Sequence, residues 1–261
     1  FNAVRFFVGF LAIIPIAYLF EAKKIKSEFR LDKKTFFILS FLIGLSLFLG
    51  SALQQVALLY TDVANAAFFT IFYVPMVPII IFIFNRKSIH WSVWPSVFLC
   101  VIGGYLLTNF QDATVRLGDT LVLLGALFWS THIIFTGIMV TKYNLPLTVG
   151  ATQTLIVSLF SFIIGSIYEE FIFKNILNEI YSILYAGILS GGIAFVLQIY
   201  AQRNITPAPA AIIFSLEGVF ATIAAWFLLN QILNINNLLG CFFILCGVLL
   251  SQLLPLIKKK A

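Results

Sequence analysis

The chain has 261 residues, of which 61% are hydrophobic, 16% aromatic and only 10% charged, and its formal net charge is +6. A soluble domain needs far more charge on its water-facing surface, so this composition excludes one. The apolar residues come in runs of about twenty, the helix length that crosses a hydrocarbon core of roughly 30 Å. We therefore expect an all-α polytopic membrane protein.

Nine apolar segments follow one another with short connections, which leave no room for a soluble domain. We expect membrane-spanning helices at about 3–20, 35–59, 64–84, 91–109, 118–139, 148–168, 181–201, 207–229 and 235–256. The sequence begins at Phe1 inside an apolar run without a basic stretch, so we do not expect a signal peptide. We expect one further span upstream, which would make ten.

Basic residues alternate between the two sides of this arrangement. Thirteen Lys and Arg residues fall on one side of the nine spans, and only Arg116 and Lys174 fall on the other. The positive-inside rule then predicts a cytoplasmic C-terminus. We expect a multi-pass protein of the cell membrane, the bacterial inner membrane. The thirteen are Lys23, Lys24, Lys26, Arg30, Lys33, Lys34, Arg86, Lys87, Lys142, Arg203, Lys258, Lys259 and Lys260.

The basic loop at residues 21–34 is explained by this orientation and by attraction to anionic lipid headgroups. A nucleic-acid partner is not expected, because no interleaving of basic and aromatic residues supports it.

The sequence also repeats weakly at an offset of 144 residues. The matched pairs include Gln54/Gln198, Ala57/Ala201, Ile79/Ile223, Phe98/Phe242, Gly103/Gly247 and Leu106/Leu250. The segments 35–59 and 181–201 are expected to run in opposite directions, so the two copies form an inverted repeat, a recurrent transporter design. We expect two five-helix halves: residues 1–110, which lack their first helix, and residues 111–261.

One carboxylate, Glu217, lies inside the apolar segment 207–229, about ten residues or roughly 15 Å from its start and therefore near the bilayer midplane. A charge there costs roughly 2.5–3.5 kcal/mol on insertion scales, so the side chain should face protein or water. Glu217 either binds substrate or carries a proton in a cavity, or it fixes the register of two helices. The small residues Gly218 and Ala221 beside it favour close helix packing, so both interpretations stay open.

The Leu216-Glu217 pair in Ser-Leu-Glu-Gly-Val-Phe-Ala resembles the Leu-Glu-Pro-like motif of the EamA-type branch of the drug/metabolite transporter superfamily, with Gly218 in place of the usual proline. The resemblance extends over essentially the whole chain. It is also carried by Arg5, Ala64–Ala67 followed by Pro75, Gly103-Gly104, Gly118–Trp129 with Trp129-Ser130, and Gly247. It implies a ten-helix inverted-repeat fold around a central cavity, and export of metabolites or amino acids.

Further candidates are expected to line the same cavity. Tyr73 is the counterpart of Glu217 at the 144-residue offset, and Gln54 and Gln198 form a symmetric pair of amides. The full predicted substrate-binding set is Glu217, Tyr73, Gln54, Gln198, Phe69, Trp129, Ser130, His132 and Phe214. Glu217 and His132 are also candidates for proton coupling.

Each of these candidates has a purely structural alternative. The amides could join helices, the rings could face lipid, and His132 could be a neutral, hydrogen-bonded helix residue. Arg5 could pair with an anionic group or extend to the interface. The Gly187–Gly191 pair has the spacing of a helix-packing motif.

Together these features predict a secondary transporter that moves a small organic metabolite, an amino acid or a similar solute, by alternating access. The sequence has no GxxxxGK[ST] or HExxH motif, which argues against ATP-driven pumping and against a membrane-embedded metalloprotease. Its three cysteines have no metal-site spacing, so we expect no metal and no cofactor. We expect a small-molecule substrate and the lipid bilayer as partners, and a monomer or homodimer. A lipid-flipping or structural membrane component stays the alternative.

Overall fold

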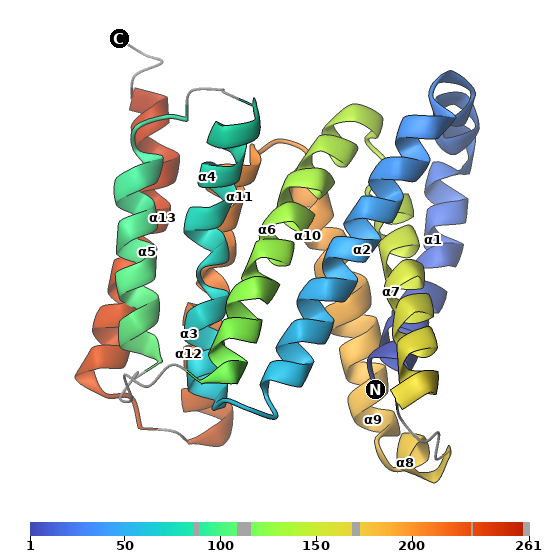
Figure 1. The fold of residues 1–261 in the computed structure, drawn as a ribbon. Coiled ribbons are helices and arrows are strands. Elements are labelled where there is room, and N and C mark those ends of the chain that lie inside the picture. The colour runs from blue at the N-terminus through green and yellow to red at the C-terminus, as the bar shows by residue number, and fades with distance from the viewer. Residues whose placement is uncertain (86–88, 109–115, 169–172, 231, 258–261) are drawn as a thin grey trace. The chain divides into compact units, whose positions relative to one another are not determined.

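The computed structural model describes residues 1–85, 89–108, 116–168, 173–230 and 232–257. Helices joined by short connections make up these ranges, which contain no strand (Figure 1). The elements are α1 (Asn2–Leu31), α2 (Lys33–Ala57), α3 (Val63–Thr70), α4 (Tyr73–Asn85), α5 (Val93–Leu107), α6 (Leu117–Tyr143), α7 (Pro146–Tyr168), α8 (Phe173–Asn178), α9 (Ile180–Leu184), the π-helix η1 (Tyr185–Ala194), α10 (Phe195–Ala201), α11 (Pro207–Phe214), α12 (Leu216–Leu229) and α13 (Ile235–Ile257).

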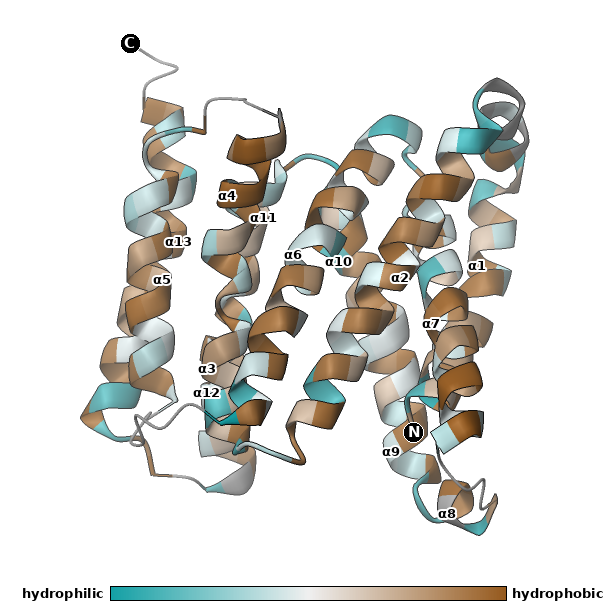
Figure 2. Ribbon diagram, in the orientation of Figure 1, coloured by the Kyte–Doolittle hydropathy of each residue, from teal (hydrophilic) through white to brown (hydrophobic). Residues whose placement is uncertain are grey.

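Eight of the nine predicted spans correspond to helical segments long and apolar enough to cross a membrane. The ninth, predicted at 91–109, is the shorter helix α5 of 15 residues. Figure 2 shows hydrophobic residues along the middle of the helices and hydrophilic residues mainly near their ends. The prediction of an all-α polytopic membrane fold is confirmed. Five of the basic residues used to orient it, Arg86, Lys87, Lys258, Lys259 and Lys260, lie outside the described residues.

The chain forms two compact units, each built from two separate stretches of sequence. The first unit comprises Phe1–Ala52 and Phe135–Ile205, and the second comprises Leu53–Ile134 and Thr206–Ala261. Each unit therefore contains residues from both of the sequence halves predicted from the repeat. This is possible because the units are defined by spatial contacts and not by chain order.

In the first unit, α1 packs against α7 and against η1. Glycines allow the second contact. A Cβ added to Gly187 would lie 2.6 Å from the backbone oxygen of Arg5, and one added to Gly9 would lie 2.9 Å from the backbone oxygen of Gly187. No larger residue fits so close to another backbone, so the Gly187–Gly191 motif serves helix packing here.

Polar contacts tie the end of α1 to the connection between α6 and α7. The carboxylate of Glu21, which is buried, accepts hydrogen bonds from the backbone N–H groups of Leu147 and Thr148 and from the Thr148 hydroxyl, at 2.6 to 3.0 Å. An acid from α1 thus caps the N-terminus of α7, where free N–H groups and the helix dipole favour negative charge. Lys24 donates to the backbone oxygen of Asn144 at 3.1 Å nearby.

Asp32, between α1 and α2, forms a 2.6 Å ion pair with Lys142 near the end of α6. The hydrogen bond from Lys142, together with those from Thr35, lowers the pKa of the Asp32 carboxyl to about 2. This carboxylate therefore stays ionised far below neutral pH and holds the loop between α1 and α2 against α6.

In the second unit, α5 and α13 lie side by side over their length (Figure 1). Their contacts are reciprocal. A Cβ on Gly103 would meet the Gly240 backbone oxygen at 2.7 Å and the Ile244 side chain at 2.6 Å. A Cβ on Gly247 would meet the backbone oxygen of Ser96 at 2.8 Å and the thiol of Cys100 at 2.9 Å. The repeat offset of 144 residues relates Gly103 to Gly247, Ser96 to Gly240 and Cys100 to Ile244. Each glycine therefore meets the same two positions of the other helix, as in a two-fold symmetric pair.

Two predicted spans of this unit are interrupted at equivalent places. Ile71 and Phe72 separate α3 from α4, and Ser215 separates α11 from α12. Ile71 and Ser215 are 144 residues apart and have nearly the same backbone angles, with φ −58° and ψ −19° at the first and φ −62° and ψ −15° at the second. The sequence predicts continuous helices here, because neither break contains glycine or proline.

The four half-helices pack unequally. α4 packs against α11, whereas among the described residues α3 and α12 make no comparable contact with each other. Instead, α12 packs against α13 and α5, and Phe69 of α3 contacts a small cluster of Ala57, Ala66 and Val122. The two interrupted spans therefore pack against each other mainly through α4 and α11.

Candidate functional site

Glu217 stands at one of these breaks, in the first turn of α12. It is the eleventh residue of the apolar segment Pro207–Leu228, so it lies near the middle of the span. Its side chain is exposed, and within the described part of the chain its carboxylate makes no hydrogen bond or ion pair. An exposed and unpaired carboxylate in hydrocarbon is costly. The exposure of Glu217 is better explained if its carboxylate faces water or a ligand than if it fixes the packing of two helices.

Tyr73, which the repeat pairs with Glu217, stands just after the other break. Tyr73 and Cys100 belong to one buried core cluster of the second unit. Tyr73 is the first residue of α4 and is 8% exposed, and its backbone oxygen accepts a 3.4 Å hydrogen bond from Ser130 of α6.

Two residues that the sequence did not single out complete this cluster. Ser215, at the break before α12, contacts the Cys100 thiol at 3.4 Å and donates a 2.6 Å hydrogen bond to the backbone oxygen of Ile212. Cys100 is fully buried. The sequence signal for Ser215 was its place beside Glu217, whereas Cys100 gave no signal beyond its place in an apolar run.

Aromatic rings surround the same region. Tyr73 belongs to a buried core cluster against which Phe72, Trp129 and Phe214 pack. Phe72 also stacks on Phe69, with ring centroids 6.1 Å apart. Three of the predicted aromatic candidates, Tyr73, Trp129 and Phe214, thus belong to or pack against one cluster. The fourth, Phe69, contacts this cluster indirectly, through Phe72.

The two glutamines of the predicted set lie in different units. Gln54, near the end of α2, donates a 3.2 Å hydrogen bond to the hydroxyl of Thr70 in α3, and so joins two helices. Gln198 is half-buried in α10 of the first unit. It is therefore not among the residues that the second unit brings together.

His132 and Arg5 occupy contrasting places. His132 is fully buried in α6, with its ring edge-on to Trp129 at 6.1 Å between centroids. Its role in proton coupling stays a prediction. Arg5, in α1 of the first unit, has its guanidinium 4.7 Å from the centre of the Phe6 ring, which is a cation–π contact.

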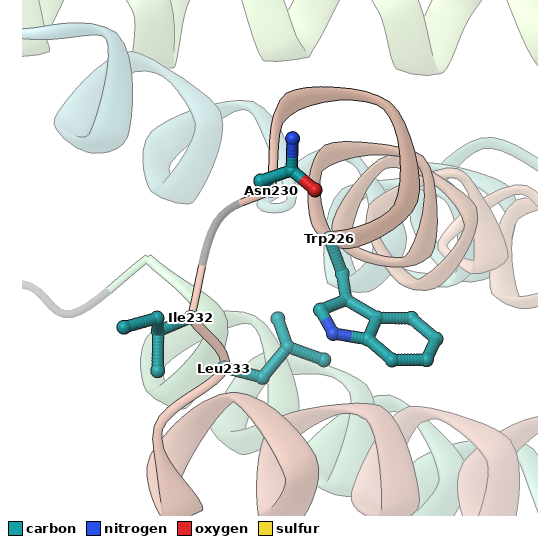
Figure 3. Close-up of a pocket in the computed structure, with 4 residues that line it drawn as sticks. All are labelled: Trp226, Asn230, Ile232 and Leu233. Atoms are coloured by element: carbon teal, nitrogen blue, oxygen red, sulfur yellow. The ribbon is translucent and has the colours of Figure 1, made fainter.

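A pocket of about 450 Å³ lies away from these residues, where α12 ends (Figure 3). Trp226, Asn230, Ile232 and Leu233 line it, and Asn230 has the left-handed conformation that asparagine tolerates at a helix end. Trp226 is nine residues, or about 13 Å, along the helix from Glu217. The pocket contains none of the predicted site residues and has the composition of a span end at the membrane interface.

Comparisons with known proteins agree with this fold. Residues 116–253 match the EamA-like transporter family. An uncharacterized transporter of Archaeoglobus fulgidus is 29% identical over 97% of this chain and 76% of its own length. The uncharacterized transporter YoaV of Bacillus subtilis is 23% identical over 96% of this chain and 86% of its own.

A solved structure, described only as the crystal structure of a protein, has the same fold with a TM-score of 0.78. It is 15% identical and is matched over 97% of this chain and 86% of its own. The family match covers more than half of the sequence described above. The chain is a multi-pass membrane protein that belongs to the EamA-like transporter family.

Proposed function

We propose that this transporter moves a small organic metabolite, an amino acid or a similar solute, out of the cell by alternating access. The observation that carries the proposal is the Glu217 carboxylate, which is exposed in the middle of a span, just after a helix break, and makes no hydrogen bond or ion pair within the described chain. Substrate sites of secondary transporters commonly lie near the bilayer midplane at the interface of two repeats.

Alternating access needs two similar packings around one site, and an inverted repeat supplies them. The helix bounds support such a repeat. α1 and α7 begin at Asn2 and Pro146, α3 and α11 begin at Val63 and Pro207, and each pair is 144 residues apart. The reciprocal glycine contacts between α5 and α13 give independent support. We infer two five-helix halves, residues 1–110 and 111–261.

The orientation and location belong to the same proposal. The Lys and Arg bias of the loops supports a cytoplasmic C-terminus, and the resemblance to bacterial relatives supports a cell membrane such as the bacterial inner membrane. Export is the direction that the family resemblance implies.

Solute counterflow in proteoliposomes tests the proposal. Vesicles loaded with one unlabelled solute, drawn from amino acids, nucleosides and organic acids, should take up the labelled form of that solute faster than empty vesicles do. Glu217→Gln should slow this uptake by about tenfold or more, because it removes a mid-span carboxylate that makes no bond to the described chain. Absence of counterflow for every solute, with lipid scrambling in its place, would support the lipid-flipping alternative and contradict the proposal.

A further inference from the structure

We propose that η1 is a hinge of the transport cycle, a segment that changes between π-helix and α-helix and thereby turns α10 about the axis of its span. This role rests on the proposed transport function, because alternating access needs an element with two arrangements. The observation behind it is that η1 (Tyr185–Ala194) interrupts a span whose two ends, α9 and α10, are α-helical.

Ten consecutive residues of π-helix are unusual in a membrane span. Hydrogen bonds of the i→i+5 pattern are rare and occur mostly as single turns, frequently at functional sites. The equivalent segment of the repeat, residues 41–50, lies within α2 in the same compact unit and is an uninterrupted α-helix. The two copies of this span therefore have different backbone geometries at the same place.

Two adjacent glycines distinguish the copies. Gly191 and Gly192 of η1 correspond to Leu47 and Phe48 of α2 at the 144-residue offset. Glycine is a poor α-helix former, because it loses more backbone freedom on folding than any other residue. The copy with the two glycines is the π-helix, and the copy with the two large apolar residues is the α-helix.

Helix packing does not explain these two glycines. Position 187 requires glycine, because a Cβ there would lie 2.6 Å from the backbone oxygen of Arg5. Beyond the four neighbouring residues of helix backbone, a Cβ on Gly191 would come no closer than 3.4 Å to another atom, and the same distance holds for Gly192. Neither glycine has a positive φ. Glycine at these two positions therefore supplies backbone freedom, which lowers the cost of exchanging one helix geometry for the other.

The exchange acts on α10, which follows η1. When one i→i+5 turn becomes an i→i+4 turn, the helix beyond it rotates by one residue position, about 100° at 3.6 residues per turn. In this structure Ile199 of α10 is fully buried in a cluster with Val149 of α7, and the neighbouring Gln198 is half-buried. One step toward the α-helix gives Gln198 the direction that Ile199 has now. The hinge thus replaces an apolar side chain by an amide at this position.

Amide hydrogen exchange of the reconstituted full chain, without added solute, tests the hinge. We expect residues 185–194 to exchange about tenfold faster than residues 41–50, the matched segment of the other copy, because the π–α exchange opens backbone hydrogen bonds. The double variant Gly191→Ala/Gly192→Ala should slow exchange in 185–194 about tenfold and raise the melting temperature by about 2–4 °C, since alanine favours the α-helix.

Transport by the same variants gives the second measurement. Counterflow of an equimolar mixture of labelled amino acids should be about tenfold slower in Gly191→Ala/Gly192→Ala than in the unmodified protein. Ser190→Ala is the matched control, because Ser190 is an exposed residue of η1 and its replacement removes no glycine. Adding Ile193→Gly to the double variant should restore counterflow in part, because Ile193 is 51% exposed and glycine there returns backbone freedom to η1.

Hydrogen exchange that is equally slow in residues 185–194 and 41–50 would overturn the hinge. Unchanged counterflow by the double variant would do the same, and so would equal slowing by Ser190→Ala. Lost counterflow together with a lower melting temperature would assign Gly191 and Gly192 to packing and would also contradict it. If the unmodified protein exchanges none of the amino acids, the proposed function fails, whereas hydrogen exchange needs no solute and still decides the hinge.

Discussion

One glutamate in each compact unit shows how differently the two units surround a carboxylate. In the first unit Glu21 is 7% exposed and accepts three hydrogen bonds at the N-terminus of α7. In the second, Glu217 is exposed, lies in mid-span and has no bond to the described chain. A carboxylate that holds a fold together is buried and saturated with donors, whereas one that serves a ligand keeps its acceptors free.

The closest helix contacts of the second unit predict the largest effect on stability. Gly103→Ala and Gly247→Ala should each lower the free energy of unfolding by about 1–3 kcal/mol, because the added Cβ meets a backbone oxygen at 2.7 Å or 2.8 Å. Gly218→Ala is the control: its Cβ would meet only the end of the Leu107 side chain, at 3.3 Å. Melting of the detergent-solubilised variants measures the difference. Equal melting temperatures for all three variants would contradict the reciprocal packing of α5 and α13.

The two glutamates predict the next effect. Glu21→Ala leaves the N–H groups of Leu147 and Thr148 without their acceptor and should cost about 1–3 kcal/mol of stability. Glu217→Gln should leave the melting temperature unchanged or raise it, because no protein hydrogen bond is lost and a charge in the span is removed. If Glu217→Gln lowered the melting temperature as much as Glu21→Ala, Glu217 would be a contact that fixes two helices.

Gln54 predicts a smaller effect within the second unit. Gln54→Leu should lower the free energy of unfolding by about 1 kcal/mol, because the hydrogen bond to Thr70 is lost. The neighbouring Gln55 is exposed and makes no side-chain bond in the described structure, so Gln55→Leu should have little effect. Chemical denaturation of both variants compares them. A larger loss for Gln55→Leu would show that the amide at position 54 does not join α2 to α3.

The pH dependence of Asp32 predicts the smallest effect, in the first unit. Its pKa is lowered from an ordinary value of 3.8 to about 2 by the hydrogen bonds from Lys142 and Thr35. The ion pair with Lys142 therefore stabilises the fold above pH ~4 and is lost as the pH falls through about 2. The difference in melting temperature between the unmodified protein and Asp32→Asn should shrink over that range. A difference that stays constant down to pH ~2 would contradict the ion pair's contribution.

Long apolar runs made the spans predictable, because length and hydropathy are local properties. The capping of α7 by Glu21 was not predictable, because it joins residues 126 and 127 positions apart in the sequence. The helix breaks at Ile71 and Ser215 were missed for a similar reason, because neither contains a glycine or proline that would mark it in the sequence. Tertiary packing accompanies them instead, such as the close approach of Ile71 to Gly104.

The site was predicted in part. Glu217 was found because a lone acid in an apolar span is conspicuous, and Tyr73 because the repeat maps it onto Glu217. Ser215 and Cys100 have no such signal, since serine and cysteine residues are common in membrane helices. Gln198 matched Gln54 in the repeat, but the two residues fall in different compact units.

Chemical access to position 217 tests the central claim most directly. The thiol introduced by Glu217→Cys should react with a water-soluble methanethiosulfonate, and a transported solute should slow the reaction. The unmodified protein, with cysteines 100, 241 and 246, gives the background, and Ile212→Cys gives the control at a fully buried position of the same span. Modification of Glu217→Cys well above both is the predicted result. Reactivity no greater than that of Ile212→Cys would contradict a water-accessible site at Glu217.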